Sequence, residues 1–218
     1  MAVPSPLTGL IAGPGWPITA VLGGGGALAY LGGAVPAAIV LGVLALGNLA
    51  FFRNPRRQAP AGEHLLLAPA DGKVVEAGPA SDPDGFVQNA QRVAIFLSIF
   101  NVHVNSAPVS GKVSGKRSSG NKFLAAFNPD ASARNVQSRL DVESLSGLRI
   151  GVAQITGLIA RRIISYPEVG DSLERGEAYG LICYGSRMEV YLPAEVALRV
   201  KPGDRVRAGA SVIGEALP

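Results

Sequence analysis

The segment APADGKV, residues 68–74, recurs as APVSGKV at residues 107–113, and five of the seven positions are identical. A second pair lies nearer the C-terminus, where VGDSL at residues 169–173 is echoed by PGDRV at residues 202–206, each with a glycine three residues further on. Every copy joins a turn to an apolar residue that can begin a strand, and the glycine can reverse the chain. The sequence therefore predicts one strand-and-turn unit that occurs twice.

The surroundings of these repeats favour strands. Short runs rich in Val and Ile occupy residues 93–100, 148–155 and 188–192, and Gly, Pro and Asn separate them. That is the pattern of strands joined by turns. Only residues 122–127 and 157–164 could hold short helices.

The Gly-Asp turn followed by an apolar residue and a further glycine resembles the half-barrel turns of biotinyl and lipoyl carrier domains. The fold class that we expect is therefore mainly β, a duplicated hybrid-motif sandwich or barrel. This resemblance concerns the fold and carries no information about chemistry.

The N-terminal quarter differs sharply from the rest, because residues 1–52 contain no Asp, Glu, Lys or Arg. Its two apolar stretches, residues 16–31 and 36–52, are each near the lower limit of about 17 residues for a spanning helix. We expect an N-terminal helical membrane hairpin over residues 1–52, followed by a second domain over residues 53–218. A buried hairpin of a globular fold, or a signal peptide, remains open, although the charged n-region of a signal peptide is missing.

The net charge of +4 therefore belongs to residues 53–218. Arg53, Arg56 and Arg57 directly follow the second apolar stretch, and the positive-inside rule places such a cluster on the cytoplasmic side. We expect the folded domain at the cytoplasmic face of the cell membrane. A modest positive charge suits an anionic lipid surface, and nothing in the sequence supports a nucleic-acid partner.

Residue types restrict the possible chemistry. The single cysteine, Cys183, excludes an intrachain disulfide, and two histidines are too few for an all-protein zinc site, so we expect no metal. No phosphate-binding loop or dinucleotide motif is present. The remaining candidates are scattered serines together with His64, His103, Cys183, Asp71, Asp82, Asp84 and Asp171.

Taken alone, these candidates have ordinary explanations. His103 is predicted at the end of an apolar strand, where it alternates with two valines and so faces the opposite side. Asp71 lies in a Pro-Ala-Asp-Gly turn, where an aspartate commonly caps its own backbone. A Gly-Ser pair before a strand, such as Gly185-Ser186, is a common turn.

From residue 52 onward, however, the sequence is similar to the short-type phosphatidylserine decarboxylases, whose archaeal relatives act on archaetidylserine. Several blocks in the same order carry this resemblance over more than three quarters of the chain. The blocks are FRNP at 52–55, APADGKV at 68–74, NVHVN at 101–105 with the following Ala107-Pro108, QITGLIARR at 154–162, and the segment 180–193.

The resemblance implies a site that the chain makes by cutting itself. In this family the Gly-Ser pair before a strand is the cleavage site, here Gly185-Ser186. Carried over position by position, Asp71 orients His103, and His103 takes the proton from the Ser186 hydroxyl as this attacks the Gly185 carbonyl. The resulting ester eliminates to dehydroalanine, which hydrolyses to a pyruvoyl group at position 186. The products are a large chain, 1–185, and a small chain, 186–218, which stay together as a heterodimer.

The resemblance also implies the substrate. The pyruvoyl group at Ser186 forms a Schiff base with the amine of phosphatidylserine in the membrane, and loss of CO2 gives phosphatidylethanolamine. Arg53, Arg56 and Arg57 either contact lipid phosphates or serve only as orientation signals. Phe100 stands where some family members have a second histidine, so the acid that protonates the decarboxylated product stays open. A homo-oligomer is also left open.

Three alternatives remain at this point. The chain could decarboxylate another serine lipid such as archaetidylserine, or a soluble amino acid, although the apolar N-terminus argues against the latter. It could also be a non-catalytic carrier of the hybrid-motif type, modified at Lys73 or Lys112. Neither lysine lies between the hydrophobic neighbours that such carriers have.

Overall fold

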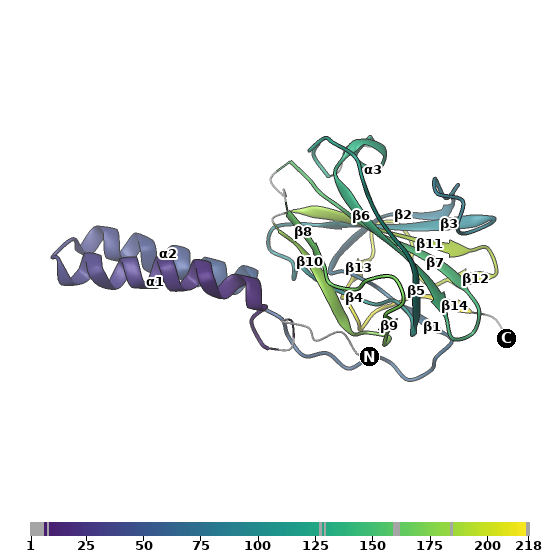
Figure 1. Ribbon diagram of the computed structural model, residues 1–218, viewed down its shortest axis with the longest axis horizontal. Helices are drawn as coiled ribbons and strands as arrows, with labels where there is room; N and C mark the ends of the chain where they lie inside the picture. The colour runs from purple at the N-terminus through teal and green to yellow at the C-terminus, as the bar shows by residue number, and fades with distance from the viewer. Residues whose placement is uncertain are drawn as a thin grey trace. The chain divides into compact units, whose positions relative to one another are not determined.

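The computed structural model describes Leu7, Asn128 and residues 9–126, 130–158, 162–183 and 185–216. The chain forms two compact units, Pro6–Arg56 and a larger one that includes Arg57–Pro218. Figure 1 shows a pair of helices in the first unit and a strand-rich second unit, which confirms the mainly β class with an N-terminal helical pair. Each unit is described by itself.

The smaller unit is a helical hairpin. After the short helix η1 (Gly13–Gly15), α1 (Trp16–Leu31) and α2 (Val35–Phe51) pack side by side (Figure 1). Both begin with a proline in the first turn, where its missing N–H costs nothing. The turn between them limits the helices to 16 and 17 residues. Neither of them, nor any other helix among the described residues, has both the length and the apolar character needed to cross a membrane.

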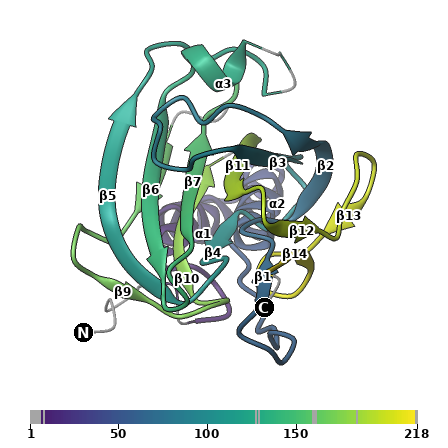
Figure 2. The same cartoon turned by 90° about the vertical axis from the view of Figure 1, so that its right-hand side faces the viewer.

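The larger unit is built from antiparallel strands. Eight of them form a curled sheet in the order β13-β2-β3-β11-β7-β6-β5-β9 (Figure 2). The other strands of the unit form two three-stranded sheets, in the orders β1-β14-β12 and β4-β10-β8. The strands are β1 (Leu65–Leu67), β2 (Gly72–Pro79), β3 (Ala90–Leu97), β4 (Val104–Ser106), β5 (Gly111–Ser119), β6 (Gln137–Ser144), β7 (Arg149–Ile155), β8 (Arg162–Ser165), β9 (Ser172–Leu173), β10 (Ala178–Cys183), β11 (Ser186–Pro193), β12 (Val196–Leu198), β13 (Arg205–Val206) and β14 (Val212–Ala216).

Strand β11 runs through the middle of the large sheet. It pairs with β3 along its whole length and with β7 on its other side, and all of its residues are buried. Met188, Val190 and Leu192 belong to the hydrophobic core, so strand alternation directs Arg187 and Glu189 to the opposite face. Both faces of the sheet are therefore covered, one by apolar side chains and the other by charged ones.

The two sequence repeats occupy equivalent places. The first copy begins β2, which pairs with β13, and the second begins β5, which pairs with β9. In each copy the N–H of the motif's valine donates to the carbonyl of the turn aspartate at 2.9 Å, from Val74 to Asp204 and from Val113 to Asp171. The internal duplication predicted from the sequence is present in the backbone hydrogen bonds.

The short helices expected at 122–127 and 157–164 are wrong where the structure describes these segments. Residues 162–164 belong to strand β8, and residues 122–126 form no helix. The side chain of Asn135 binds both the N–H and the carbonyl of Leu124, at 2.7 and 2.8 Å, so these backbone groups are engaged outside a helix. The helix in this region is α3 (Ala131–Arg134), and residues 127, 129 and 159–161 lie outside the described part.

Candidate active site

Ser186 is the first residue of β11 and lies opposite Leu97 of β3. Its side chain is completely buried, and its hydroxyl has no hydrogen-bond partner among the residues that the structure describes. A buried hydroxyl without a partner costs about 1–3 kcal/mol. Such groups are rare in native proteins and call for a functional explanation. A nucleophile whose lone pairs are uncommitted is one such explanation.

Gly185 precedes it with a φ angle of +71°, in the left-handed region that favours glycine. A Cβ at this position would find its nearest neighbour, Cγ2 of Ile99, at an ordinary contact distance of 3.7 Å. Glycine is therefore favoured here by the backbone conformation and not by lack of space. Tyr184, the residue before it, lies outside the described part.

His103 approaches this pair of residues from another element. Its Nε2 lies 3.2 Å from the backbone nitrogen of Gly185, and its Nδ1 lies 2.9 Å from the carbonyl oxygen of Asn101. Because a carbonyl only accepts, the two contacts place the ring proton on Nδ1 and leave Nε2 as an acceptor. An imidazole with an Nε2 lone pair next to Gly185-Ser186 has the right form for a general base.

The predicted strand position of His103 is wrong. Strand β3 ends at Leu97 and β4 begins at Val104, so the histidine lies in the connection between them. A bend closes this connection, because the side chain of Asn101 accepts hydrogen bonds from both the N–H and the hydroxyl of Ser98, at 2.9 and 2.8 Å. Both flanking valines are buried as well, so the expected alternation is absent.

Asp71 lies at the turn before β2 and is also buried. Its carboxylate forms an ion pair with Arg57 through both oxygens, and Oδ1 accepts the N–H of Ala208 at 2.9 Å. In the second repeat the hydroxyl of Ser110 accepts the N–H of Arg175 in the same way, at 3.1 Å. Asp71 thus fastens a turn, as its counterpart does. Its expected role of orienting His103 stays a prediction.

The three arginines expected near lipid phosphates have different surroundings. Arg57 binds Asp71 and the carbonyl of Ala208, so its guanidinium is already engaged within the larger unit. Arg53 donates to the carbonyl of Ala50 at 2.6 Å, and Arg56 is exposed. A contact with lipid stays a prediction for all three arginines. Arg57 is the least suited of them, because its guanidinium is already bound to Asp71 and Ala208.

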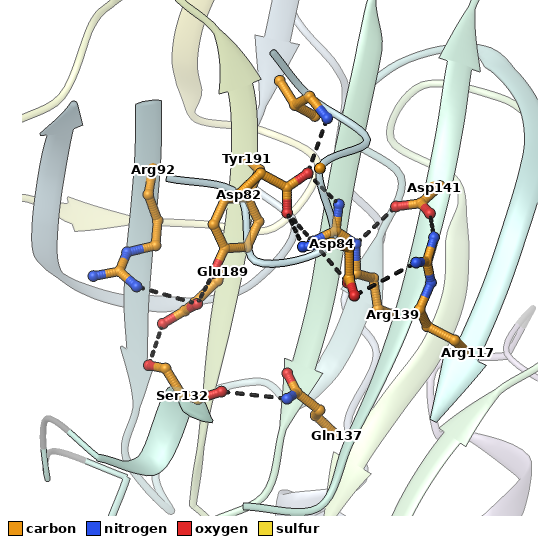
Figure 3. Close-up of polar contacts among 12 residues, drawn as sticks. Asp82, Asp84, Arg92, Arg117, Ser132, Gln137, Arg139, Asp141, Glu189 and Tyr191 are labelled. Atoms are coloured by element: carbon orange, nitrogen blue, oxygen red, sulfur yellow. Dashed lines mark hydrogen bonds and ion pairs between the residues drawn. The ribbon is translucent and has the colours of Figure 1, made fainter. Parts of the chain in front are cut away.

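Charged side chains form a network on one face of the large sheet (Figure 3), and strand alternation places Ser186, like Met188, on the other face. Arg139 lies at its centre and pairs with Asp82, Asp84 and Asp141, and Arg117 also binds Asp141. Burial raises the pKa of Asp82, but hydrogen bonds from Arg139 and from backbone N–H groups outweigh it and hold the pKa below its ordinary value. The network therefore favours the ionised form of Asp82.

The same network extends to β11 itself. Arg187, the residue after Ser186, binds Glu76 at 2.6 Å and Glu189 at 2.7 Å, and Glu189 also accepts from Ser132 and Tyr191. A cavity of about 380 Å³ opens beside these residues, and its lining contains Asp84 but none of Asp71, His103, Gly185 and Ser186. In the described part of the chain no group of His, Cys, Asp or Glu is arranged to hold a metal ion.

At Gly185-Ser186 the structure thus brings together a buried serine hydroxyl, a left-handed glycine before it and an imidazole acceptor, the residue types that nucleophilic cleavage of a backbone uses. Comparison with known proteins identifies the family. The family model described as phosphatidylserine decarboxylase matches residues 47–214. The chain belongs to the phosphatidylserine decarboxylase family.

Individual relatives agree with this assignment. The chain is 45% identical over 216 residues to a protein of Trichlorobacter lovleyi, covering 95% of this chain and 97% of the relative. Identities of 44% and 47% relate it to proteins of Geobacter metallireducens and Syntrophotalea carbinolica, over 86% and 85% of this chain and 87% and 86% of the relatives. All three bear the name phosphatidylserine decarboxylase proenzyme.

Sequence reasoning missed the charged face of the sheet. The signal was present, because Arg187 and Glu189 alternate with apolar residues in β11, and Arg139 and Asp141 do so in β6. Charges at every second position of an apolar strand indicate a second covered or solvated face. Their pairing with Asp82 and Glu76 depends on the fold and leaves no trace in the spacing.

Proposed function

We propose that this chain is a phosphatidylserine decarboxylase proenzyme that cuts itself between Gly185 and Ser186 and then converts phosphatidylserine to phosphatidylethanolamine and CO2. The observation that carries the proposal is the buried hydroxyl of Ser186, which has no hydrogen-bond partner among the described residues, next to the hydrogen bond between His103 and Gly185. The names of the relatives support the activity and the self-cleavage.

The cut proceeds through an ester. Nε2 of His103 releases the Gly185 N–H and takes the hydroxyl proton, Oγ of Ser186 bonds to the carbonyl carbon of Gly185, and the C–N bond breaks as the nitrogen receives the proton. Loss of the Cα proton of residue 186 then expels the Gly185 carboxylate. Water hydrolyses the resulting dehydroalanine with release of ammonia, and the small chain begins with a pyruvoyl group.

The fold suits this outcome because the new terminus begins a central strand. When present, the pyruvoyl group supplies a ketone that accepts the electrons left by departing CO2. Residues of the chain fix its place: the ion pairs of Arg187 with Glu76 and Glu189 hold the residue next to it. Asp71 orienting His103 is part of the proposal and rests on the family motif.

Membrane association is also proposed. A lipid with two acyl chains rarely leaves the bilayer, so the site must work at its surface. The helices α1 and α2 expose many large apolar side chains, among them Val21, Leu28, Ile39 and Leu46. They are suited to attach the enzyme to the cell membrane, with Arg53 and Arg56 near anionic head groups on the cytoplasmic side. The hybrid-motif character of the fold stays a prediction of the repeat pattern.

Intact mass of the purified protein tests the cut. We expect two chains, one ending at Gly185 and one beginning with a pyruvoyl group, and a single uncut chain for Ser186→Ala. Ser165→Ala is the matched control, since its hydroxyl is also buried and unpartnered in the described part. It should be cut normally. Cutting of Ser186→Ala at the wild-type rate would overturn the proposal.

The substrate is tested with the mature protein. Release of CO2 should occur from detergent-dispersed phosphatidylserine and not from free serine. Activity on a serine lipid with isoprenoid tails but not with acyl tails would favour the archaetidylserine alternative. A single full-length chain with an adduct on Lys73 or Lys112 would instead indicate a carrier.

A further inference from the structure

The carbonyl group of Gly185 lies against Gly157, two residues beyond the end of β7. A Cβ on Gly157 would lie 2.5 Å from the carbonyl oxygen of Gly185 and 3.4 Å from its carbonyl carbon. Real Cβ atoms essentially never approach a heavy atom within 3.0 Å. The neighbour is backbone, so it cannot turn aside as the end of a long side chain can. Only glycine at position 157 leaves room for the Gly185 carbonyl as it stands.

Gly157 is held firmly from its N-terminal side. Both the N–H and the hydroxyl of Thr156 donate to the carbonyl of Val136, at 3.0 and 2.8 Å. The carbonyl of Thr156 in turn accepts from the buried side chain of Asn135, at 2.8 Å. The same Asn135 side chain fastens Leu124, so the segment 121–126 and the end of β7 form one frame.

That frame fixes the positions of Ala126 and Gly157 beside the Gly185 carbonyl. Ala126, at the end of the segment 121–126, is buried, and its Cβ would be 3.3 Å from a Cβ on Gly157. Gly157 is therefore enclosed between Ala126 on one side and the Gly185 carbonyl on the other. A side chain at this position would have to displace one or the other.

We propose that Gly157 is a positioning residue for self-cleavage: its missing side chain allows the Gly185 carbonyl to be held where the Ser186 hydroxyl can attack it. The inference rests on the proposed cleavage site. Nucleophilic attack needs the reacting atoms about 3–3.5 Å apart and aligned, and a misplacement of about 1 Å can reduce the rate about 100-fold. The step concerned is the first one, in which the Oγ–C bond forms and the C–N bond breaks.

The test is Gly157→Ala, followed by intact mass over time after synthesis. We expect cutting to slow about 100-fold or more while the chain remains folded by circular dichroism. Hydroxylamine separates the steps, because it cuts esters much faster than amides. A chain that cannot form the ester should show little hydroxylamine-dependent cutting, whereas a chain blocked only in elimination should show much.

Two further variants separate positioning from loss of packing. Gly111→Ala is a matched control, since its Cβ would meet the backbone oxygen of Glu143 at 2.4 Å in the pair β5–β6, which contains none of the proposed site residues. We expect it to be cut normally when folded. Gly157→Ala combined with Ala126→Gly relieves only the contact with Ala126, so it should remain uncut.

Opposite results would overturn the inference. They are cutting of folded Gly157→Ala at the wild-type rate, rescue by Ala126→Gly, or an equal loss in folded Gly111→Ala. If Gly157→Ala does not fold, Asn135→Ala replaces it, because it adds no atom and only releases the frame. It should slow ester formation, and unchanged cutting would count against the inference. A wild-type chain that is not cut at Gly185-Ser186 would instead sink the proposed function.

Discussion

Nε2 of His103 accepts the backbone N–H of Gly185 at 3.2 Å, so the imidazole is tied to the peptide unit just before the one that the serine must attack. The contact fixes the ring with its Nε2 lone pair directed toward the backbone at the cleavage site. Because Nε2 has a single lone pair, the histidine must release the Gly185 N–H before it takes the serine proton, so holding Gly185 and acting as base are two separate duties.

Replacing His103 by glutamine separates these duties. The amide oxygen of glutamine can still accept the Gly185 N–H, but it is far too weak a base to take the serine proton. We expect His103→Gln to be cut at least about 100-fold more slowly, as for loss of a general base. Gel and mass time courses measure this. The control is His64→Gln, at a side chain that is 56% exposed, which should be cut normally. Normal cutting of His103→Gln would remove the proposed base.

The equivalence of Asp71 and Ser110 offers a test of the aspartate. Asp71→Ser copies the other repeat, so its hydroxyl can still accept the N–H of Ala208 as Ser110 accepts that of Arg175. If Asp71 orients His103, this variant should be cut slowly although the turn is preserved. Arg57→Ala, which keeps the carboxylate, tests the ion pair separately. Cutting of Asp71→Ser at the normal rate would reduce Asp71 to a structural cap.

The backbone of Gly185 gives a third prediction. Alanine in the left-handed region costs about 1–2 kcal/mol. Because a Cβ at this position meets no close neighbour, Gly185→Ala should fold and be cut about tenfold more slowly, as the scissile peptide relaxes to other angles. Gly147→Ala is matched, since Gly147 has a φ of +86° and open space around it. It should leave the rate of cutting unchanged. The measurement is the rate of appearance of the small chain.

The sequence predicted those elements of the fold that depend on local patterns of apolar and turn residues. The apolar runs at 93–100, 148–155 and 188–192 predicted strands that the structure has at 90–97, 149–155 and 186–193, and the apolar stretches predicted the helical pair. The repeated motif predicted the internal duplication. The position of His103 did not follow, because the bend at Asn101 is made by a side chain and interrupts an otherwise apolar run. Strand β8 was mistaken for helix because a short apolar run fits both periods.

The site depended still more on distant contacts. Ser186 was singled out by the family blocks alone. Its burial, and the lack of a partner for its hydroxyl within the described part of the chain, arise only when β11 is inserted between β3 and β7. Gly157 lies within the family block at residues 154–162, but nothing in the spacing indicates that its Cα faces the Gly185 carbonyl. Close approaches between loops from different parts of the chain leave no periodic signal.

The charged face predicts the acid stability of the protein. Asp82 is fully buried against Arg139, and its pKa in the folded chain lies below the unfolded value. Its ionised form therefore stabilises the fold above about pH 4, and this contribution is lost as the pH falls further, through the folded pKa. Asp82→Asn should lower the free energy of unfolding at pH 7 by about 3 kcal/mol, and by less at pH 3.

Urea unfolding in the uncut Ser186→Ala background measures this difference, because a single chain then unfolds. Glu168→Gln is the control, since Glu168 pairs with Lys116 at an exposed site and should contribute less than about 1 kcal/mol. Equal effects of the two variants at pH 7 would mean that the buried network adds no special stability.

The central place of β11 has a consequence for assembly. Cutting before Ser186 would leave residues 186–218 as a separate molecule whose first strand is hydrogen-bonded on both sides and whose last strand, β14, pairs with β1. The fragment would stay in place through these contacts. Once unfolded, however, the mature protein would have to reassemble from two molecules, so its recovery should depend on concentration, whereas the uncut chain refolds alone. The protein would therefore fold as one continuous chain before the cut, and the mature form would afterwards depend on slow unfolding to stay intact.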